Sequence, residues 1–139
     1  MNGTIFGGDL LNWIENVATK TASLFTRNKT VFTINMSKIS FKKPIKPSDW
    51  LILKSRVVFV RMYTLQVEVE VFIENKNEKI LSHSGIFTLI NIEEGTGLKK
   101  KIFTGIKLEA TDQEGLRDYL LARTRHFFWR RFRKSQSKL

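Results

Sequence analysis

A chain of 139 residues, 42% of them hydrophobic, is long enough to bury one core and too short for two domains of ordinary size. It has no cysteine and only two histidines, which excludes a catalytic thiol, a disulfide framework and a sulfur-based zinc site. We therefore expect no bound metal. No apolar run approaches the length of a membrane span, and the first residues lack the features of a secretory signal, which predicts a cytoplasmic protein.

The net charge of +11 lies largely at the end of the chain. Residues 119–139 contain seven arginines and lysines and no acidic residue, so the remainder is only weakly basic. His126, Phe127, Phe128 and Trp129 lie among these cations, and a basic aromatic segment suits nucleic acid or an anionic membrane surface. A solvated, charged helix end is the simpler interpretation, so we expect neither nucleic acid nor a membrane as a partner.

The first predicted element is a long helix. Apolar or small residues follow helical spacing from Leu10 to Phe25, and Asp9 suits a cap position directly after Gly7 and Gly8. Because most of its perimeter is apolar or small, we expect other elements to enclose the helix.

Residues 30–92 alternate in the manner of strands, with predicted strands at 32–41, 51–60, 63–73 and 80–92. The alternation changes phase near Lys38, which predicts a bulge there. Within the third strand, Gln66, Glu68 and Glu70 alternate with apolar residues, so one face is expected to be wet. One helix followed by an antiparallel meander gives an α+β class.

The chain after residue 92 has a different composition. Residues 94–101 are rich in glycine and lysine and predict a solvated linker. Residues 111–114 form a capping box that opens a final helix ending near Arg133. The predicted organisation is a domain at 1–98 and a basic linker with a C-terminal helix at 99–139.

A candidate site lies where the first helix begins. Glycines before a helix allow backbone amides and the positive helix end to face a ligand oxygen, which polarises a carbonyl. Glu15 lies at the edge of the apolar face among small residues, where burial would raise the pKa of its carboxyl and suit it to base chemistry. Spacing alone favours an ordinary tight turn and a solvated Glu15.

Four segments together resemble a known family. They are NGTIFGGDLLNWIE, SFKKPIKPSDW, VVFVRMYTLQVEVEV and GIFTLINIEEG, and they cover residues 2–95 in one order. This set is similar to the acyl-CoA thioesterases of the hotdog superfamily, specifically the YciA-like and brain acyl-CoA hydrolase group. The resemblance implies a hotdog fold, in which an antiparallel sheet wraps one long central helix, and the hydrolysis of acyl-CoA to free acid and CoA.

The resemblance also implies roles for individual residues. Glu15 falls where this group usually has a catalytic aspartate, and Asn2 matches its catalytic asparagine. Gly7 and Gly8 match the glycines that start the helix and would stabilise the oxyanion. Glu15 would act as base or as nucleophile, and Asn2 would orient the water or the thioester. In this family two subunits share each active site, which implies a homodimer as the smallest active unit and trimers of dimers as the assembly.

CoA carries phosphates and is part of the substrate, so no separate cofactor is expected. Lys42, Lys43, Arg61 and Thr64 are the candidate CoA contacts, because they lie in or near the predicted loops. The sequence differs from the family pattern in having Glu15 for aspartate and RMYT for Gly-Arg-Thr-Ser. In addition, only Met1 precedes Asn2, where members usually carry a first strand.

Two other functions fit the same sequence. A hotdog domain that senses acyl-CoA without cleaving it would keep the pocket and have no need of Glu15. A nucleic-acid or membrane-surface binder would depend on residues 119–139 and would lose its ligand steeply with salt. His83 is expected to be a structural histidine with no catalytic role.

Overall fold

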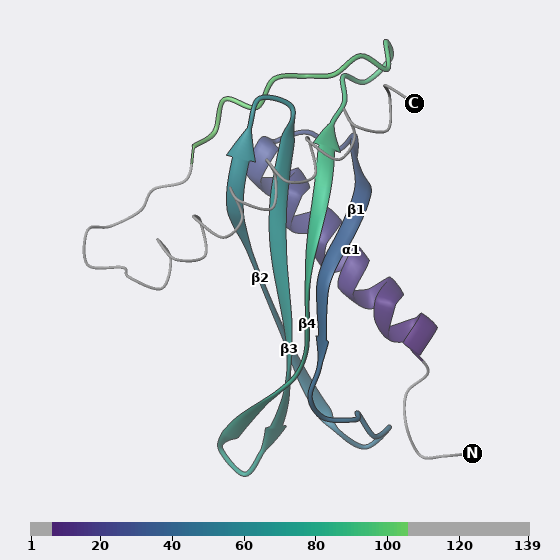
Figure 1. Cartoon of the computed structure of the whole chain (residues 1–139), viewed down its shortest axis with the longest axis vertical. Helices are drawn as coiled ribbons and strands as arrows, with labels where there is room; N and C mark the ends of the chain where they lie inside the picture. Colours follow the sequence, from purple (N-terminus) through teal and green to yellow (C-terminus); the bar gives the residue numbers. More distant parts are fainter. Residues whose placement is uncertain (1–6, 106–139) are drawn as a thin grey trace, which may run out of the picture.

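The computed structural model describes residues 7–105 of the chain. One helix precedes four strands that form a single antiparallel sheet of order β1-β4-β3-β2 (Figure 1). The elements are α1 (Gly7–Thr26), β1 (Val31–Phe41), β2 (Trp50–Arg61), β3 (Thr64–Asn75) and β4 (Glu78–Asn91). The predicted helix and α+β class are confirmed, and β2, β3 and β4 form a meander as predicted. The meander prediction is wrong for β1, which pairs with β4 and not with β2, because the chain between β1 and β2 crosses to the other edge of the sheet. The predicted C-terminal helix and Asn2 lie outside the described residues.

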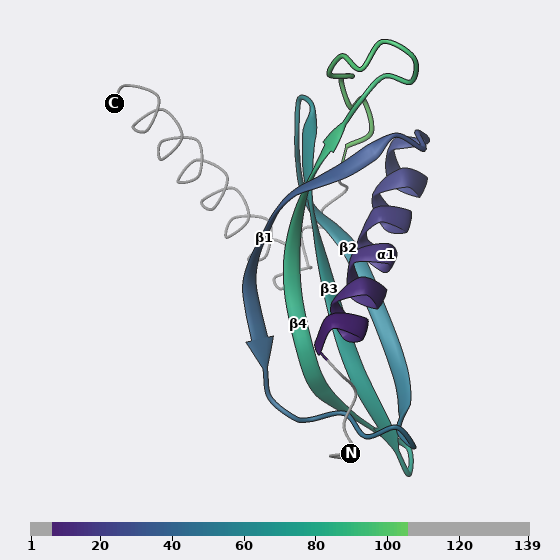
Figure 2. The same ribbon diagram turned by 90° about the vertical axis from the view of Figure 1, so that its right-hand side faces the viewer.

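The core lies between α1 and the inner face of the sheet (Figure 2). The central strand β3 supplies its middle, because Leu65, Val67, Val69 and Val71 all point toward α1 and are completely buried. Ala18 and Ala22 of the helix are also completely buried, and their small side chains allow the helix backbone to approach the strands. The alternation read from the sequence therefore identifies the inner face of the sheet correctly.

The opposite face of β3 is drier than the sequence predicts. Gln66 is only 3% exposed, although its place among acidic residues predicted a wet face. Its register partners on the neighbouring strands, Phe59 and Thr88, are buried as well. Glu68 stays partly exposed and accepts hydrogen bonds from Arg56 across the strand pair, with a shortest distance of 3.2 Å between Arg56 Nη2 and Glu68 Oε1.

Bulges curve β1 around the helix. The register with β4 shifts between Ser37 and Ser40, and Lys38 inside this shift has a φ of 50°, in the left-handed region. The predicted bulge near Lys38 is therefore confirmed. A second shift, between Thr33 and Asn35, has no signal in the sequence pattern.

The helix differs from its prediction in two respects. It begins at Gly7, so Asp9 lies within the first turn, where its carboxylate complements the positive end of the helix dipole. In the described chain only one side of α1 is buried, and Trp13 and Leu24 on the other side are 45% and 73% exposed. The expectation of an enclosed helix is wrong here, because a single four-stranded sheet covers only one side of a helix.

The predicted linker contacts the domain again. Its glycine turn and lysines are exposed, but Ile102 is buried in the core and its backbone amide donates a hydrogen bond to the Met62 carbonyl. Lys100 donates from its backbone amide to the carbonyl of Asn91. Residues 100–102 therefore pack on the domain, and the proposed division at residue 98 stays a prediction. Within residues 7–105, no helix has the length and apolarity needed to cross a membrane.

Candidate functional site

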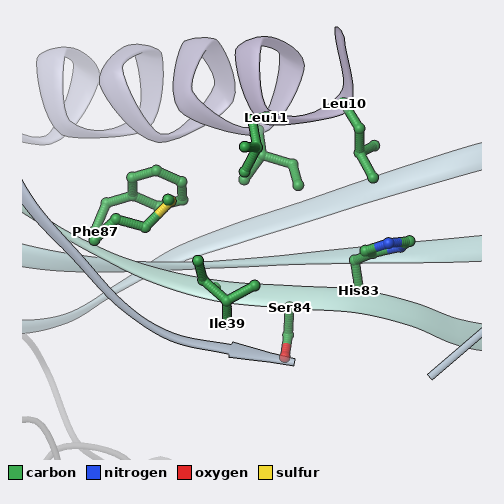
Figure 3. Close-up of a pocket in the computed structure, with 9 residues that line it drawn as sticks. Leu10, Leu11, Ile39, His83, Ser84 and Phe87 are labelled. Carbon is green, nitrogen blue, oxygen red and sulfur yellow. The ribbon is translucent and has the colours of Figure 1, made fainter. Parts of the chain in front are cut away.

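A cavity of about 120 Å³ lies between the N-terminal half of α1 and strands β1 and β4 (Figure 3). Its walls are almost entirely apolar. The lining residues are Leu10, Leu11 and Ile14 of α1, Met36 and Ile39 of β1, and His83, Ser84, Gly85 and Phe87 of β4. Figure 3 shows the two leucines of the helix facing Ile39, His83 and Phe87 across this space.

Gly85 helps to keep the cavity open. It pairs with Val69, a core residue, and therefore lies on the inner face of the sheet. Among the residues that line the cavity, it is the one without a side chain. A Cβ atom at Gly85 would lie 3.7 Å from Cε2 of Phe87, which is ordinary van der Waals contact. A side chain at this position would therefore fit against Phe87 and occupy part of the cavity.

His83 and Ser84 are the polar residues of the wall, and His83 has contacts with Ser82 and Phe41. Its Nδ1 atom lies 2.7 Å from the Ser82 hydroxyl, and that hydroxyl donates to the carbonyl of Lys43. The edge of the imidazole packs against Phe41, with 4.8 Å between ring centroids. Burial lowers the pKa of His83 from its ordinary value of 6.5, because desolvation disfavours the charged ring. These contacts account for the position of His83, and its purely structural role stays a prediction.

Glu15 follows Leu11 by four residues, so it lies one helix turn beyond Leu11 on the same face of α1, next to the cavity-lining Ile14 in sequence but not itself in the cavity wall. The side chain is exposed in the single chain, which agrees with the solvated Glu15 that the spacing alone favours. The reason is the exposed side of α1 described above, on whose border Glu15 lies. Gly7 and Gly8 form the first turn of the same helix, at its positive end.

The four candidate CoA contacts do not come together in one chain. Lys42 and Lys43 follow β1 at the cavity end of the sheet, where their backbone amides lie 2.8 and 3.4 Å from the Ser82 carbonyl that accepts from both. Arg61 and Thr64 flank the turn between β2 and β3, at the opposite end of the sheet. The hydroxyl of Thr64 donates to the Arg61 carbonyl at 3.3 Å.

Sequence reasoning missed several residues of this region. The cavity residues Met36 and Gly85 come from different strands, and only the strand order and register place them together. Thr33 on β1 was also missed: its hydroxyl is buried and has no hydrogen-bond partner within residues 7–105. No group of three or more histidine, aspartate or glutamate side chains in this part of the chain is arranged to hold a metal ion.

The sequence of this chain is similar to one protein family and to curated members of related function. A family model described as the thioesterase superfamily matches residues 2–80. The uncharacterized acyl-CoA thioester hydrolase YkhA of Bacillus subtilis is 31% identical over 94 residues, which cover 66% of this chain and 54% of the relative. The matched part of the chain thus spans about half the length of that curated relative.

Two solved structures extend the comparison to the fold. An acyl-CoA hydrolase from Staphylococcus aureus in complex with butyryl coenzyme A, coenzyme A and coenzyme A disulfide has a TM-score of 0.83 and 27% identity, covering 98% of this chain and 80% of the other. An apo-hexameric acyl-CoA thioesterase has a TM-score of 0.81 and 26% identity, covering 99% and 84%. Alanine variants of one aspartate, one asparagine and one threonine of the S. aureus enzyme are also among the matching structures. The predicted hotdog fold is confirmed.

Proposed function

Because the chain belongs to the thioesterase superfamily, we propose that it hydrolyses acyl-CoA thioesters to a free acid and CoA. The observation that carries the proposal is the apolar cavity beside the first turns of α1, with the carboxylate of Glu15 on the next turn. An acyl chain needs an apolar site, and its carbonyl needs both a polarising group and a base at the mouth of that site. The finer assignment to the YciA-like group and the cytoplasmic location stay predictions.

The reaction joins a water oxygen to the thioester carbon and breaks the bond between that carbon and the CoA sulfur. Glu15 either removes the proton from the water or attacks the carbonyl itself and is released by water in a second step. The amides of the Gly7 and Gly8 turn stabilise the negative charge on the carbonyl oxygen, because they lie at the positive end of α1. The CoA thiolate leaves and takes up the proton.

The role of Asn2 has weaker support than that of Glu15. One asparagine and one aspartate of the S. aureus hydrolase were each replaced by alanine. The sequence separation between those two residues is two residues longer than the separation between Asn2 and Glu15. With Glu15 aligned to that aspartate without a gap, Asn2 does not align with that asparagine. An Asn2→Ala variant that keeps its turnover would remove Asn2 from the catalytic set and leave Glu15 in it.

The active unit is proposed to be a homodimer joined through β1. This strand is one edge of the described sheet, and its exposed apolar side chains include Phe32, Ile34 and Phe41. An exposed apolar edge strand is a template for pairing with another chain. Trp13, on the exposed side of α1, is a further exposed apolar side chain that a second subunit would cover. A dimer would also allow lysines of one subunit and Arg61 of the other to meet the phosphates of one CoA.

Glu15→Gln tests the reaction. With a panel of acyl-CoAs, release of CoA thiol is expected to fall by about 10²-fold or more, because the amide can neither accept the proton nor act as nucleophile. Glu94→Gln, at an exposed turn far along the chain from α1, is the matched control and should keep full turnover. If the wild type binds acyl-CoA and releases no thiol from any substrate, the protein is an acyl-CoA sensor and the proposal is wrong.

Ile34→Lys tests the assembly. A lysine on the β1 edge is expected to convert a dimer into monomers in sedimentation experiments and to abolish turnover, because charged edges resist pairing. Trp50→Lys is the control, since Trp50 is 79% exposed on β2, the other edge strand of the described sheet. A wild type that is monomeric and fully active would overturn this part of the proposal.

A further inference from the structure

We infer that the cavity between α1, β1 and β4 limits the substrate to acyl chains with a short, apolar tail, and that Gly85 is the residue that sets this limit. The inference rests on the proposed function, because it names the substrate class for the same site. It depends on the size of the cavity, on the chemistry of its walls and on the absence of a side chain at one position.

The size of the cavity favours a short chain. An engineered protein cavity of about 150 Å³ lined by apolar side chains binds benzene, a ligand of six carbons. The cavity here is slightly smaller, at about 120 Å³, so it suits a tail of up to about six carbons. Met36 and Phe87 border it together with Ile39, and a longer chain has to displace these side chains or leave the cavity for solvent.

The walls favour an alkyl tail over a polar one. Apart from His83 and Ser84, every lining side chain is apolar or absent. His83 Nδ1 already donates to the Ser82 hydroxyl, whose own proton goes to the Lys43 carbonyl, and burial lowers the pKa of the ring, which favours the neutral histidine. No carboxylate, lysine or arginine lines the cavity, so an ω-carboxylate or a hydroxyl in the tail would lose its hydration without a charged partner.

Gly85 controls the depth of this space. It lies in the middle of β4 on the cavity wall, and a Cβ atom placed there meets only a ring carbon of Phe87, at 3.7 Å. A methyl group is therefore accepted without strain and takes the place of about one methylene of the ligand. A larger side chain at this position excludes more of the tail.

The test measures binding of non-cleavable S-alkyl-CoA thioethers, from ethyl to dodecyl, with free CoA as the baseline. For the wild type, the Kd is expected to fall roughly fourfold for each added methylene up to about six carbons and then to stay level. Gly85→Ala should move the break by about one carbon toward shorter chains, and Gly85→Val by more. Met36→Ala, at a side chain that is already 36% exposed, should move it toward longer chains.

Gly105→Ala is the matched control, because a Cβ atom there meets nothing within 4 Å and lies outside the cavity. It should leave the profile unchanged. A Kd that keeps falling to dodecyl, that ignores chain length, or that breaks at the same length in Gly85→Ala and Met36→Ala overturns the inference. Because the thioethers cannot be hydrolysed, this result is independent of turnover. Wild-type protein that shows the break at six carbons and cleaves no acyl-CoA would retain the inference and overturn the proposed function.

Discussion

At the C-terminal end of α1 buried polar groups satisfy one another, whereas at its N-terminal end apolar side chains surround a cavity. The polar end centres on Asn28, whose side-chain amide donates to Asn91 Oδ1 and to the Ile92 carbonyl, each at 2.7 Å. Asn91 in turn donates to the Lys100 carbonyl. The cavity end has one short chain of hydrogen bonds, through Ser82 and His83, and its remaining walls are packed loosely. The difference separates the end that stabilises the domain from the end that can accept a ligand.

Asn91→Ala should produce the largest effect, and at the polar end. Asn91 is 2% exposed, and its removal leaves the Asn28 amide and the Lys100 carbonyl without their side-chain partner. We expect a loss of about 2–3 kcal/mol in the free energy of unfolding, measured by urea denaturation. Asn75→Ala, at an exposed strand end, should stay within about 0.5 kcal/mol. Equal effects of the two variants would show that the network does not stabilise this end.

The hydrogen bonds of the polar end could not be predicted from the sequence, although the helix and strands that bring their residues together could. Alternation in 63–73 correctly identified the buried face of β3, because successive side chains of a strand point to opposite faces and the apolar set therefore marks the buried one. Nothing in that pattern shows that Asn28 and Asn91 meet, since the contact depends on how the chain returns from α1 into β1. The burial of Ile102 was missed for the same reason: a segment rich in glycine and lysine looks solvated.

The candidate site was predictable in part. The glycine segment and Glu15 could be identified because both lie within one stretch of sequence. The cavity could not, because its walls come from α1, β1 and β4 and depend on the register across the sheet. The sequence also does not show that Lys42 and Lys43 lie at the end of the sheet opposite Arg61 and Thr64, because the direction of each strand, and hence the end where each loop lies, follows from the topology.

Ser82→Ala should have an intermediate effect and tests whether the cavity end depends on its few hydrogen bonds. Ser82 is completely buried, and its hydroxyl joins the loop after β1 to His83. We expect a loss of about 1 kcal/mol in the free energy of unfolding, together with weaker CoA binding, because the same bond holds the loop that carries Lys42 and Lys43. Ser48→Ala, in an exposed turn, is the control. A stability loss as large as that of Asn91→Ala would contradict the contrast between the ends.

The smallest expected effect is a pH dependence of stability that originates at His83. Burial lowers the pKa of His83 in the folded chain below the value of 6.5 that it has when unfolded. Between those two pKa values the unfolded chain binds more protons than the folded chain. The free energy of unfolding is therefore highest above pH 6.5, falls as the pH drops toward the folded pKa, and then levels off. Urea denaturation from about pH 8 to about pH 5 should show this decline in the wild type and a flatter profile in His83→Gln. The effect is small because the ring is only partly buried and solvent screens its charge.

His126→Gln, the same change at the second histidine of the chain, should retain the wild-type slope. If the slope disappears in His126→Gln and persists in His83→Gln, the pH dependence does not arise from the cavity wall.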